Sequence, residues 1–350
     1  MTIIIALLLL GLAFYLLAII TDEFFVPAID KISVKLKLSS DAAGATLLAM
    51  GSSAPEFFTS LIAVLGLAGG DHGDIGAGTI VGSAIFNVLV IVGAAAMFKA
   101  VKLQWQPVIR DQVFYVITIL LLLVAFMDGK IVLWEALVFV GMYGVYVFTV
   151  VNWRKIFDYK DIVVSIDTED KKRNKLNQVT HKLLSFVLPD VSKKPKLMLV
   201  TFIGSILLIA ALSWLLVNQV VVIADVLSIN ATFLALTLLA AGTSLPDLIG
   251  SIVVAKQGRG DMAVSNAIGS NIFDVLFGLG FPWLLVLALG RESVVVGTEN
   301  LFASIILLFA TVISLLFMLI VRNWKIGHRA GLLLIGLYVC YVIYTVLSVV

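Results

Sequence analysis

The sequence predicts an all-α integral membrane protein with ten transmembrane helices, arranged as two inverted-topology repeats of five. Hydrophobic residues make up 61% of the 350 residues, charged residues only 13%, and the mean hydropathy is +1.12. These values lie well outside the range of ordinary soluble domains. About ten separate apolar windows reach the roughly 20 residues that a helix needs to cross hydrocarbon. One short motif also occurs twice, once in each half of the chain.

The apolar windows, taken in chain order, give the expected helices. They run roughly over residues 2–20, 42–67, 75–98, 111–127, 131–151, 197–217, 231–255, 262–289, 300–321 and 328–349. The first window lacks a basic n-region and a small-residue cleavage site, so we interpret it as a retained helix rather than a signal peptide. The single cysteine, Cys340, excludes an internal disulfide. The expected domains are a five-helix repeat at 1–151, a connector at 152–196 and a second five-helix repeat at 197–350.

Positive charges predict the orientation of these helices. If both termini lie outside, every Lys and Arg except Lys130 and Arg291 falls in a cytoplasmic segment, and Arg110 counts among the cytoplasmic loop residues. An excess of basic residues in cytoplasmic loops is typical of membrane proteins. The connector 152–196 is rich in lysine and of mixed charge, so we expect a solvated cytoplasmic linker that faces lipid headgroups. The sequence therefore predicts a multi-pass protein with its N-terminus and C-terminus outside.

The repeated motif lies in the second and seventh windows. Its first copy reads Leu48-Ala-Met-Gly-Ser-Ser-Ala-Pro-Glu-Phe-Phe-Thr-Ser60, and its second reads Leu239-Ala-Ala-Gly-Thr-Ser-Leu-Pro-Asp-Leu-Ile-Gly-Ser251. The second copy lies five helices after the first, so the two copies cross the membrane in opposite directions, as in folds that bind ions near the midplane between inverted repeats. A charged side chain at this depth costs at least ~2.5 kcal/mol on insertion scales and is seldom present without a function.

The residues of the motif indicate a cation site. Pro55 and Pro246 lack an N–H, so the carbonyls of Gly51 and Gly242 lose their helical partners, and we expect the backbone to unwind at these glycines. The motif then offers hydroxyl and carboxylate oxygens, from Ser52, Ser53 and Glu56 in the first copy and from Thr243, Ser244 and Asp247 in the second. Because nitrogen and sulfur are missing, these oxygens suit hard cations such as sodium and calcium.

A second pair of segments follows the motif in each half. Val81-Gly-Ser-Ala-Ile-Phe-Asn87 corresponds to Ile268-Gly-Ser-Asn-Ile-Phe-Asp274. Ser83 and Asn87 are four residues apart, as are Ser270 and Asp274, so each pair projects from one helix face. Small-residue packing of the serines and an interhelical hydrogen bond from Asn87 are the alternative interpretations. The exchange of an amide for an acid between the repeats favours a role in selecting which ions bind.

In these motifs the chain resembles the cation/calcium antiporter superfamily, whose two alpha-repeats carry Gly-[Ser/Thr]-Ser-x-Pro-[Glu/Asp] followed by Gly-Ser-x-x-x-[Asn/Asp]. The resemblance implies a secondary antiporter that exchanges sodium for calcium by alternating access. It also implies that backbone carbonyls one turn before the hydroxyls bind ions. The implied metal ligands are Ala49, Ser52, Ser53, Glu56, Ser83 and Asn87 in the first repeat and Ala240, Thr243, Ser244, Asp247, Ser270 and Asp274 in the second.

Within the superfamily, these motifs and Phe-Pro-Trp283 are most similar to the potassium-dependent sodium/calcium exchanger branch. Calcium/proton exchangers typically show Gly-Asn-Ala-x-Glu instead. With Glu56 and Asp247, Asp274 gives three carboxylates, which calcium and potassium together would neutralise. With calcium alone one carboxyl should stay protonated, because close like charges resist joint ionisation. Asp274 is therefore either a potassium ligand or a neutral acid.

Other classes of function remain as alternatives. A calcium/proton or other cation antiporter, a cation channel and a calcium-sensing membrane protein could all use similar helices. The sequence shows no ATP-binding motif, so primary pumping is not expected. We expect no enzyme activity, no cofactor, no nucleic-acid partner and no obligate protein partner, only Ca²⁺, Na⁺ and, on the branch resemblance, K⁺, together with membrane lipid. The connector is too short for the large regulatory domains of many animal exchangers, and the expected location is the cell (inner) membrane of a prokaryote.

Overall fold

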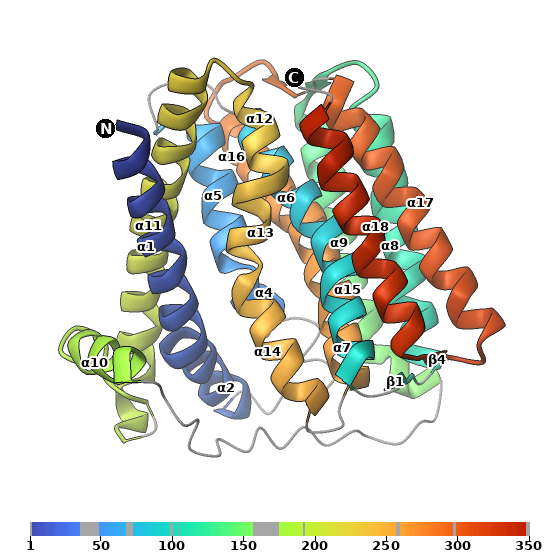
Figure 1. The fold of residues 1–350 in the computed structure, drawn as a ribbon, viewed down its shortest axis with the longest axis horizontal. Helices are drawn as coiled ribbons and strands as arrows, with labels where there is room; N and C mark the ends of the chain where they lie inside the picture. The colour runs from blue at the N-terminus through green and yellow to red at the C-terminus, as the bar shows by residue number, and fades with distance from the viewer. Residues whose placement is uncertain are drawn as a thin grey trace.

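A computed structural model gives the structure of residues 2–35, 49–67, 73–98, 101–103, 105–156, 175–191, 193–256, 260–296 and 299–347. Long helices run side by side through the molecule, and both termini lie at the same edge (Figure 1). Within the described ranges, the strands are four short pieces of two residues each, and the rest of the regular structure is helical. This agrees with the predicted all-α class.

The described part of the first half contains helices in the order that the apolar windows predict. Its third crossing is one continuous helical stretch with a π-helical middle. The elements are α1 (Thr2–Ile20), the π-helix η1 (Thr21–Phe25), α2 (Val26–Lys35), α4 (Ala49–Ser52), α5 (Ala54–Leu65), α6 (Gly73–Phe86), the π-helix η3 (Asn87–Ile91), α7 (Val92–Phe98), α8 (Trp105–Ala125) and α9 (Leu133–Ile156).

The second half repeats this order after the connector, which contributes α10 (Lys175–Leu184) and the 3-10 helix η4 (Pro195–Leu197). In both halves the second crossing is interrupted, between α4 and α5 and between α13 and α14, and the third crossing has a π-helical middle. The elements are α11 (Met198–Leu227), α12 (Ala231–Leu234), the π-helix η5 (Ala235–Leu239), α13 (Ala240–Thr243), α14 (Leu245–Lys256), α15 (Gly260–Phe273), the π-helix η6 (Asp274–Leu279), α16 (Gly280–Ala288), α17 (Glu299–Val321) and α18 (His328–Leu347).

Eight uninterrupted helical spans in the described part are long and apolar enough to cross a membrane. The two predicted windows without such a span are 42–67 and 231–255, which carry the two copies of the motif. Their described parts hold the shorter apolar helices Ala54–Leu65 and Ala231–Thr243. The total of ten crossings therefore stays a prediction. The eight spans are Thr2–Ala28, Gly73–Met97, Trp105–Ala125, Leu133–Trp153, Pro195–Leu227, Ala263–Ala288, Leu301–Val321 and His328–Leu347.

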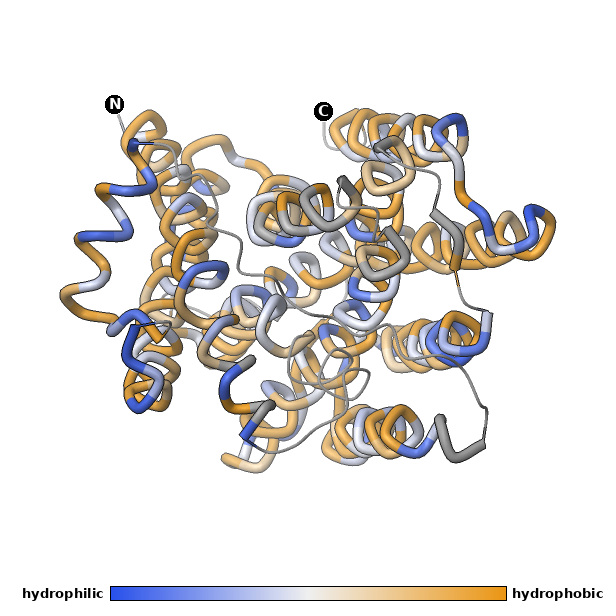
Figure 2. The backbone as a smooth tube through the Cα atoms, turned by 90° about the horizontal axis from the view of Figure 1, so that it is seen from below, coloured by the Kyte–Doolittle hydropathy of each residue, from blue (hydrophilic) through white to orange (hydrophobic). Residues whose placement is uncertain are grey.

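The third crossing of each half forms the centre of the bundle. The most apolar window of Gly73–Met97 is 89% buried and that of Ala263–Ala288 is 72% buried, whereas the other six spans are between 28% and 50% buried. Seen from below, the helices carry mostly hydrophobic residues (Figure 2). Peripheral helices that expose apolar side chains are expected in lipid, which solvates them without cost. The polar motif residues of these central helices are thus placed away from lipid.

Two short antiparallel ladders tie the halves together. Strand β1 (Val101–Lys102) pairs with β4 (Lys325–Ile326), and β2 (Lys130–Ile131) pairs with β3 (Val294–Val295). Strands β1 and β3 follow the third crossing of their halves, whereas β2 and β4 follow the fourth. Each ladder therefore joins the loop after the third crossing of one half to the loop after the fourth crossing of the other half. This exchange is the arrangement expected of two repeats related by a pseudo-two-fold axis.

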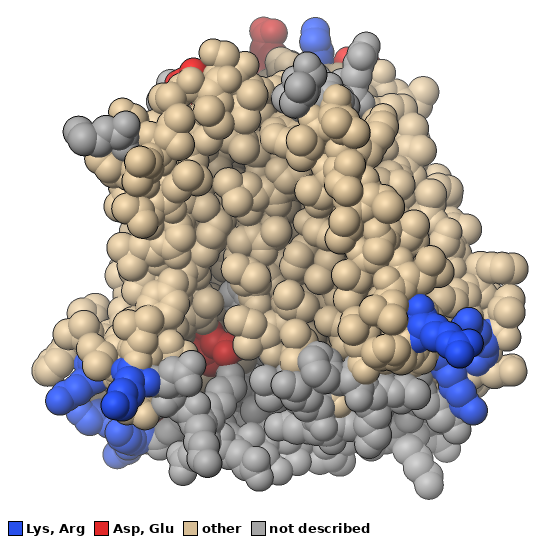
Figure 3. Space-filling view, in the orientation of Figure 1, with Lys and Arg blue, Asp and Glu red and all other residues tan. Residues whose placement is uncertain are grey.

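In the view of Figure 3, the charged side chains on the surface of the described residues lie near the two edges of the molecule. In the face shown in Figure 3, the described Lys and Arg side chains gather mainly along the lower edge, opposite the edge that holds both termini, and a broad band between the edges is almost free of charge. An uncharged band between two polar edges is what the hydrocarbon core of a bilayer requires.

Arg110 is not in a loop. Helix α8 begins at Trp105, earlier than the predicted window, so Arg110 and Asp111 both lie inside it and are only 5% and 4% exposed. Arg110 Nε donates to Asp111 Oδ1 at 2.7 Å, and a second guanidinium nitrogen donates to Oδ2 at 3.1 Å. The expectation that Arg110 lies in a loop was wrong, because hydropathy counts both charges although Arg110 and Asp111 neutralise each other. The cytoplasmic side of Arg110 stays a prediction.

Part of the connector docks onto the helix bundle. His181 of α10 is 8% exposed, its ring stacks on Phe24 with centroids 4.9 Å apart, and its Nε2 lies 3.6 Å from Glu23 Oε2. The Tyr15 hydroxyl donates to Asn177 Oδ1 at 3.0 Å. One side of α10 therefore packs against α1 and η1, while most of its residues are exposed. The solvated connector that faces lipid headgroups stays a prediction.

Candidate cation site

Both copies of the motif interrupt their helix at an equivalent serine. Ser53 has φ −89° and ψ 9°, and Ser244 has φ −86° and ψ 0°, which is the sparsely populated bridge region rather than the helical one. Pro55 lies in the first turn of α5, where a missing N–H costs little. The expected unwinding at Gly51 and Gly242 was therefore wrong in position. Both glycines are helical, and the proline begins a new helix after the break.

The other two motif segments contain π-helices at equivalent places. Helix η3 begins at Asn87 and η6 begins at Asp274, the residues that the repeat alignment matches. Single π-helical turns are rare inside α-helices and occur frequently at functional sites. The apolar residues of these stretches gave no sign of such a turn. The two polar residues are thus placed by a backbone feature that the sequence analysis did not predict.

The hydroxyl of Ser244 joins the two repeats. Its Oγ lies 2.7 Å from Ser83 Oγ and donates to Glu56 Oε1 at 3.3 Å. The hydroxyls of Thr243 and Ser83 also face the Glu56 carboxylate. The acid of the first repeat is therefore surrounded by hydroxyls, two of which come from the second repeat.

Equivalent contacts occur in the other direction. The Asp247 carboxylate faces the Ser52 hydroxyl, and the Asp274 carboxylate faces the Ser53 hydroxyl. Asp247 and Asp274 also interact electrostatically with Glu56. Each acid of the second repeat therefore lies against a hydroxyl of the first, and the three carboxylates share one neighbourhood.

Asn87 connects the third crossings of the two repeats. Its Nδ2 donates to Ser270 Oγ at 3.4 Å and to Asn271 Oδ1 at 2.8 Å. Asn271 was not among the predicted residues. Its counterpart in the first repeat is Ala84, so a search for polar residues present in both copies could not find it.

Several hydroxyls of the site donate to their own helix. Ser52 Oγ donates to Ala49 O at 3.3 Å, and Ser270 Oγ donates to Ala267 O at 3.3 Å. Thr243 Oγ1 donates to Leu239 O at 3.1 Å. A hydroxyl has one hydrogen and two lone pairs, so a donor bond to the backbone leaves lone pairs for a cation. Helix back-bonding and cation binding are therefore compatible in these side chains.

All the predicted ligands are buried. Ser52 is 9% exposed and Asp247 is 8% exposed, whereas each of the other ten is at most 2% exposed. Four side-chain oxygens of the predicted ligands are buried without a hydrogen-bond partner among the described residues: Ser53 Oγ, Glu56 Oε2, Asn87 Oδ1 and Asp274 Oδ1. A buried acceptor without a partner costs about 1–3 kcal/mol, which contact with a cation would offset.

The donors are of mixed type. Among the described residues, no group of three or more His, Cys, Asp or Glu side chains is placed to hold a metal ion by itself. A cation would therefore also need hydroxyl, amide or backbone oxygens. The carbonyls of Ala49 and Ala240 accept from the N–H groups of Ser53 and Ser244 at 3.0 and 3.2 Å, which places them at the breaks, where their predicted role as ligands stays a prediction.

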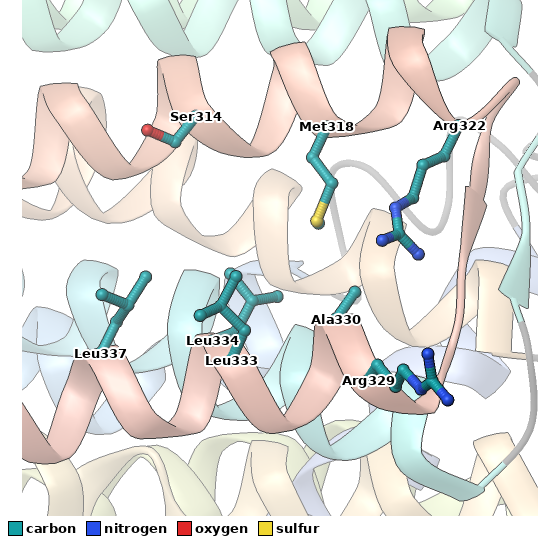
Figure 4. Close-up of a pocket in the computed structure, with 8 residues that line it drawn as sticks. All are labelled: Ser314, Met318, Arg322, Arg329, Ala330, Leu333, Leu334 and Leu337. Atoms are coloured by element: carbon teal, nitrogen blue, oxygen red, sulfur yellow. The ribbon is translucent and has the colours of Figure 1, made fainter.

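A groove between α17 and α18 is separate from these residues. Figure 4 shows apolar side chains along it and two arginines at one end. It contains none of the twelve predicted ligands. Its lining is Ser314, Met318, Arg322, Arg329, Ala330, Leu333, Leu334 and Leu337.

The fold and the buried motif residues together define a membrane protein in which two inverted repeats meet at a cluster of oxygen atoms. The chain belongs to the sodium/calcium exchanger protein family, whose family model matches residues 5–152 and 197–347. The matched ranges correspond to the two predicted repeats and leave out most of the connector. This match confirms the predicted superfamily. The members of the family are ion transporters rather than enzymes.

Individual relatives and solved structures agree with this assignment. Sodium/potassium/calcium exchanger 2 of Gallus gallus is 29% identical, covering 95% of this chain and 76% of the relative, and exchanger 3 of Rattus norvegicus is 30% identical, covering 96% and 82%. The H⁺/Ca²⁺ exchanger CAX has a TM-score of 0.72 at 15% identity, covering 97% of this chain and 82% of that one. The sodium-calcium exchanger NCX_Mj has a TM-score of 0.60 at 24% identity, covering 97% of each chain. These structures show a shared fold.

Proposed function

We propose that this protein exchanges sodium for calcium by alternating access, with the ions bound between the two repeats. One observation carries the proposal: Ser244, a motif hydroxyl of the second repeat, contacts both Ser83 and Glu56 of the first. Motif residues of the two repeats thus meet in one buried cluster. Family membership supports sodium and calcium as the transported ions.

The chemistry of the cluster suits these two ions. Calcium takes six to eight oxygen ligands and favours carboxylates, so Glu56 and Asp247 supply most of its countercharge. Sodium carries half that charge and relies more on neutral oxygens, which the hydroxyls provide. The proposed ligands are the twelve predicted ones: Ala49, Ser52, Ser53, Glu56, Ser83, Asn87, Ala240, Thr243, Ser244, Asp247, Ser270 and Asp274.

The burial of the cluster favours a carrier over a channel. A channel conducts through a wetted path, whereas ten of the twelve proposed ligands are at most 2% exposed. Ser52 and Asp247 are the most exposed of the set and face each other. We infer that ions enter and leave past this pair in the conformation described here.

Potassium is a proposed third ion. The relatives named above are sodium/potassium/calcium exchangers, and Asp274 adds a third carboxylate near Glu56 and Asp247. Calcium and potassium together carry three positive charges and would balance three ionised carboxylates. In the other mechanism, Asp274 stays protonated while calcium is bound, and potassium has no effect on transport.

The proposed orientation has both termini outside and the connector 152–196 in the cytoplasm, in the cell (inner) membrane of a prokaryote. The position of both termini at one edge, with most described basic side chains at the other edge of the face shown, supports this orientation (Figures 1 and 3). Labelling of single cysteines introduced near residues 130 and 325 from one side of the membrane would test it. Reaction of both positions from the same side would contradict it.

The proposed function is tested by uptake of radiolabelled calcium into proteoliposomes. An antiporter loaded with sodium should accumulate calcium when sodium is absent outside, and should do so much less when sodium is equal on both sides. A channel would pass calcium in both conditions. An imposed proton gradient without sodium tests the calcium/proton alternative, because the H⁺/Ca²⁺ exchanger CAX has a similar fold. Uptake driven by protons and indifferent to sodium would overturn the proposal.

A further inference from the structure

Asn271 makes three hydrogen bonds inside the membrane-spanning bundle. Its Nδ2 donates to Ala84 O at 3.2 Å and to Tyr115 Oη at 2.9 Å, and its Oδ1 accepts from Asn87 Nδ2 at 2.8 Å. The side chains of Asn271 and Tyr115 are completely buried. The residue therefore links α15 to α8 and to the start of η3.

The donor and acceptor types in this chain of contacts allow only one orientation of the amides. The Ala84 carbonyl can only accept, so the Asn271 NH₂ group must face it, and Asn271 Oδ1 then faces Asn87. An oxygen at that place requires the NH₂ group of Asn87. Tyr115 does not decide the orientation, because a phenol both donates and accepts, but its hydroxyl gives the Asn271 NH₂ group a second acceptor.

The orientation of Asn87 matters because a carboxamide has two unlike ends. An oxygen binds a cation, whereas an NH₂ group repels it. With Asn87 Nδ2 directed at Asn271 and Ser270, Asn87 Oδ1 is left buried without a hydrogen-bond partner among the described residues. That is the state of an oxygen that is ready to bind a cation.

The two repeats differ at this point in a complementary way. The counterpart of Asn87 is Asp274, whose carboxylate has two equivalent oxygens and needs no such control. The counterpart of Asn271 is Ala84, which has no side chain to exert it. Asn271 thus contacts Asn87, whose side chain presents either an oxygen or an NH₂ group to an ion, depending on the orientation of the amide.

We propose that Asn271, anchored by the Ala84 carbonyl and held by Tyr115, is a positioning residue that fixes the Asn87 amide with its oxygen toward the transported cation. The inference rests on the proposed function, since it takes Asn87 to be a ligand. Asn271 itself does not contact the ion. It acts through Asn87, as residues behind a metal ligand do when they orient it.

The test is a double-mutant cycle between Asn271→Ala and Asn87→Asp. Its readouts are the calcium KM of sodium-driven uptake and the calcium concentration that half-stabilises the detergent-solubilised protein against heat. Loss of an orienting partner typically costs roughly 10- to 100-fold in metal affinity. We expect Asn271→Ala to raise both calcium midpoints by that factor with a smaller change in kcat. In the Asn87→Asp background, where no amide can turn, the same substitution should shift them by less than about threefold.

Two tyrosine variants keep the proposal testable if Asn271→Ala does not fold. Tyr115→Phe removes one acceptor and should raise the calcium midpoint by roughly 2- to 10-fold. Tyr146→Phe is the matched control, because its buried hydroxyl donates to Asp111 and not to Asn271, and it should leave the midpoint unchanged.

Equal shifts from Asn271→Ala in both backgrounds, or equal effects of the two tyrosine variants, would overturn the positioning role. A wild-type calcium midpoint in both Asn271→Ala and Tyr115→Phe would do the same. Each of these results leaves the proposed function intact as long as the wild type shows sodium-driven calcium uptake. Absence of that uptake in the wild type would instead contradict the proposed function, and the thermal midpoints would then still report whether Asn271 affects calcium binding.

Discussion

Ser83 and Ser244 face each other across the boundary between the two repeats, with their hydroxyl oxygens 2.7 Å apart. Because the single hydrogen of Ser244 is donated to Glu56 Oε1, Ser83 is the donor in the bond between the two serines. The Ser244 hydrogen is thus directed at the carboxylate and the Ser83 hydrogen at Ser244 Oγ. In the proposed site, a cation on Glu56 would replace the Ser244 hydrogen, and both hydroxyls could rotate to present lone pairs instead. In the proposed site, binding would therefore exchange hydrogen bonds for ion contacts.

The first prediction concerns the two motif acids. Glu56→Gln and Asp247→Asn each remove one unit of countercharge at nearly constant shape, and we expect sodium-driven calcium uptake to fall to background. Asp128→Asn is the control, because this exposed acid lies between α8 and α9, where it accepts a hydrogen bond from the Lys130 N–H. Near wild-type uptake by a well-expressed Glu56→Gln protein would mean that the site has been placed wrongly.

The second prediction separates sodium from calcium. Alanine at Ser52, Ser53, Thr243 or Ser244 removes a neutral oxygen, on which sodium depends more than calcium does. We expect the sodium activation midpoint of each variant to move to higher concentration by a larger factor than the calcium midpoint. Sodium activation curves measured at fixed calcium test this. Four unchanged curves would assign these hydroxyls to helix packing alone.

The third prediction concerns potassium. If Asp274 is a potassium ligand, calcium exchange by the wild type rises with potassium. The rise disappears in Asp274→Asn, because only two carboxylates remain and calcium alone balances their charge. Exchange is measured with potassium present or replaced by choline on both faces. A wild type that is indifferent to potassium would leave the protonated acid as the role of Asp274.

The fourth prediction concerns a close approach between the repeats. A Cβ at Gly82 would collide with the Leu236 carbonyl and lie 2.7 Å from Ala240 Cβ, so Gly82→Ala forces α6 away from η5 and α13. We expect a loss of about 1–3 kcal/mol of stability, visible as a lower unfolding temperature in detergent. Gly141→Ala is the matched control, since a Cβ there meets nothing within 4 Å and a helical alanine is favoured over glycine. Equal unfolding temperatures for the two variants would show that the repeats separate there without cost.

The fold could be predicted because the same helix pattern and motif occur twice in the chain. Glu56 and Asp247 occupy matching places in apolar windows, so duplication and charge together make them the main candidate site residues. Asn271 could not be found in this way, since its partner position holds Ala84. Its importance depends on a backbone carbonyl and a tyrosine from helices far away in the chain.

Local backbone geometry was also beyond the sequence patterns. The π-helices begin at Asn87 and Asp274, and a hydropathy pattern could not predict this, because the hydropathy of these segments would be the same in an α-helix. The breaks at Ser53 and Ser244 were expected at the preceding glycines, because the rule for an internal proline was applied where each proline begins a helix. Arg110 was misplaced because its neutralising neighbour is visible only as a contact.

The two loop ladders bear on how such a chain could have arisen. Each ladder pairs the loop after a third crossing with the loop after a fourth crossing of the other half. Two identical five-helix chains inserted in opposite directions would form the same two ladders, one on each side of the bilayer. Fusing their genes through a linker would then require no new contact at either surface. The present chain is in this sense a covalently joined antiparallel dimer, free to let its halves diverge at single positions such as Asn87 and Asp274.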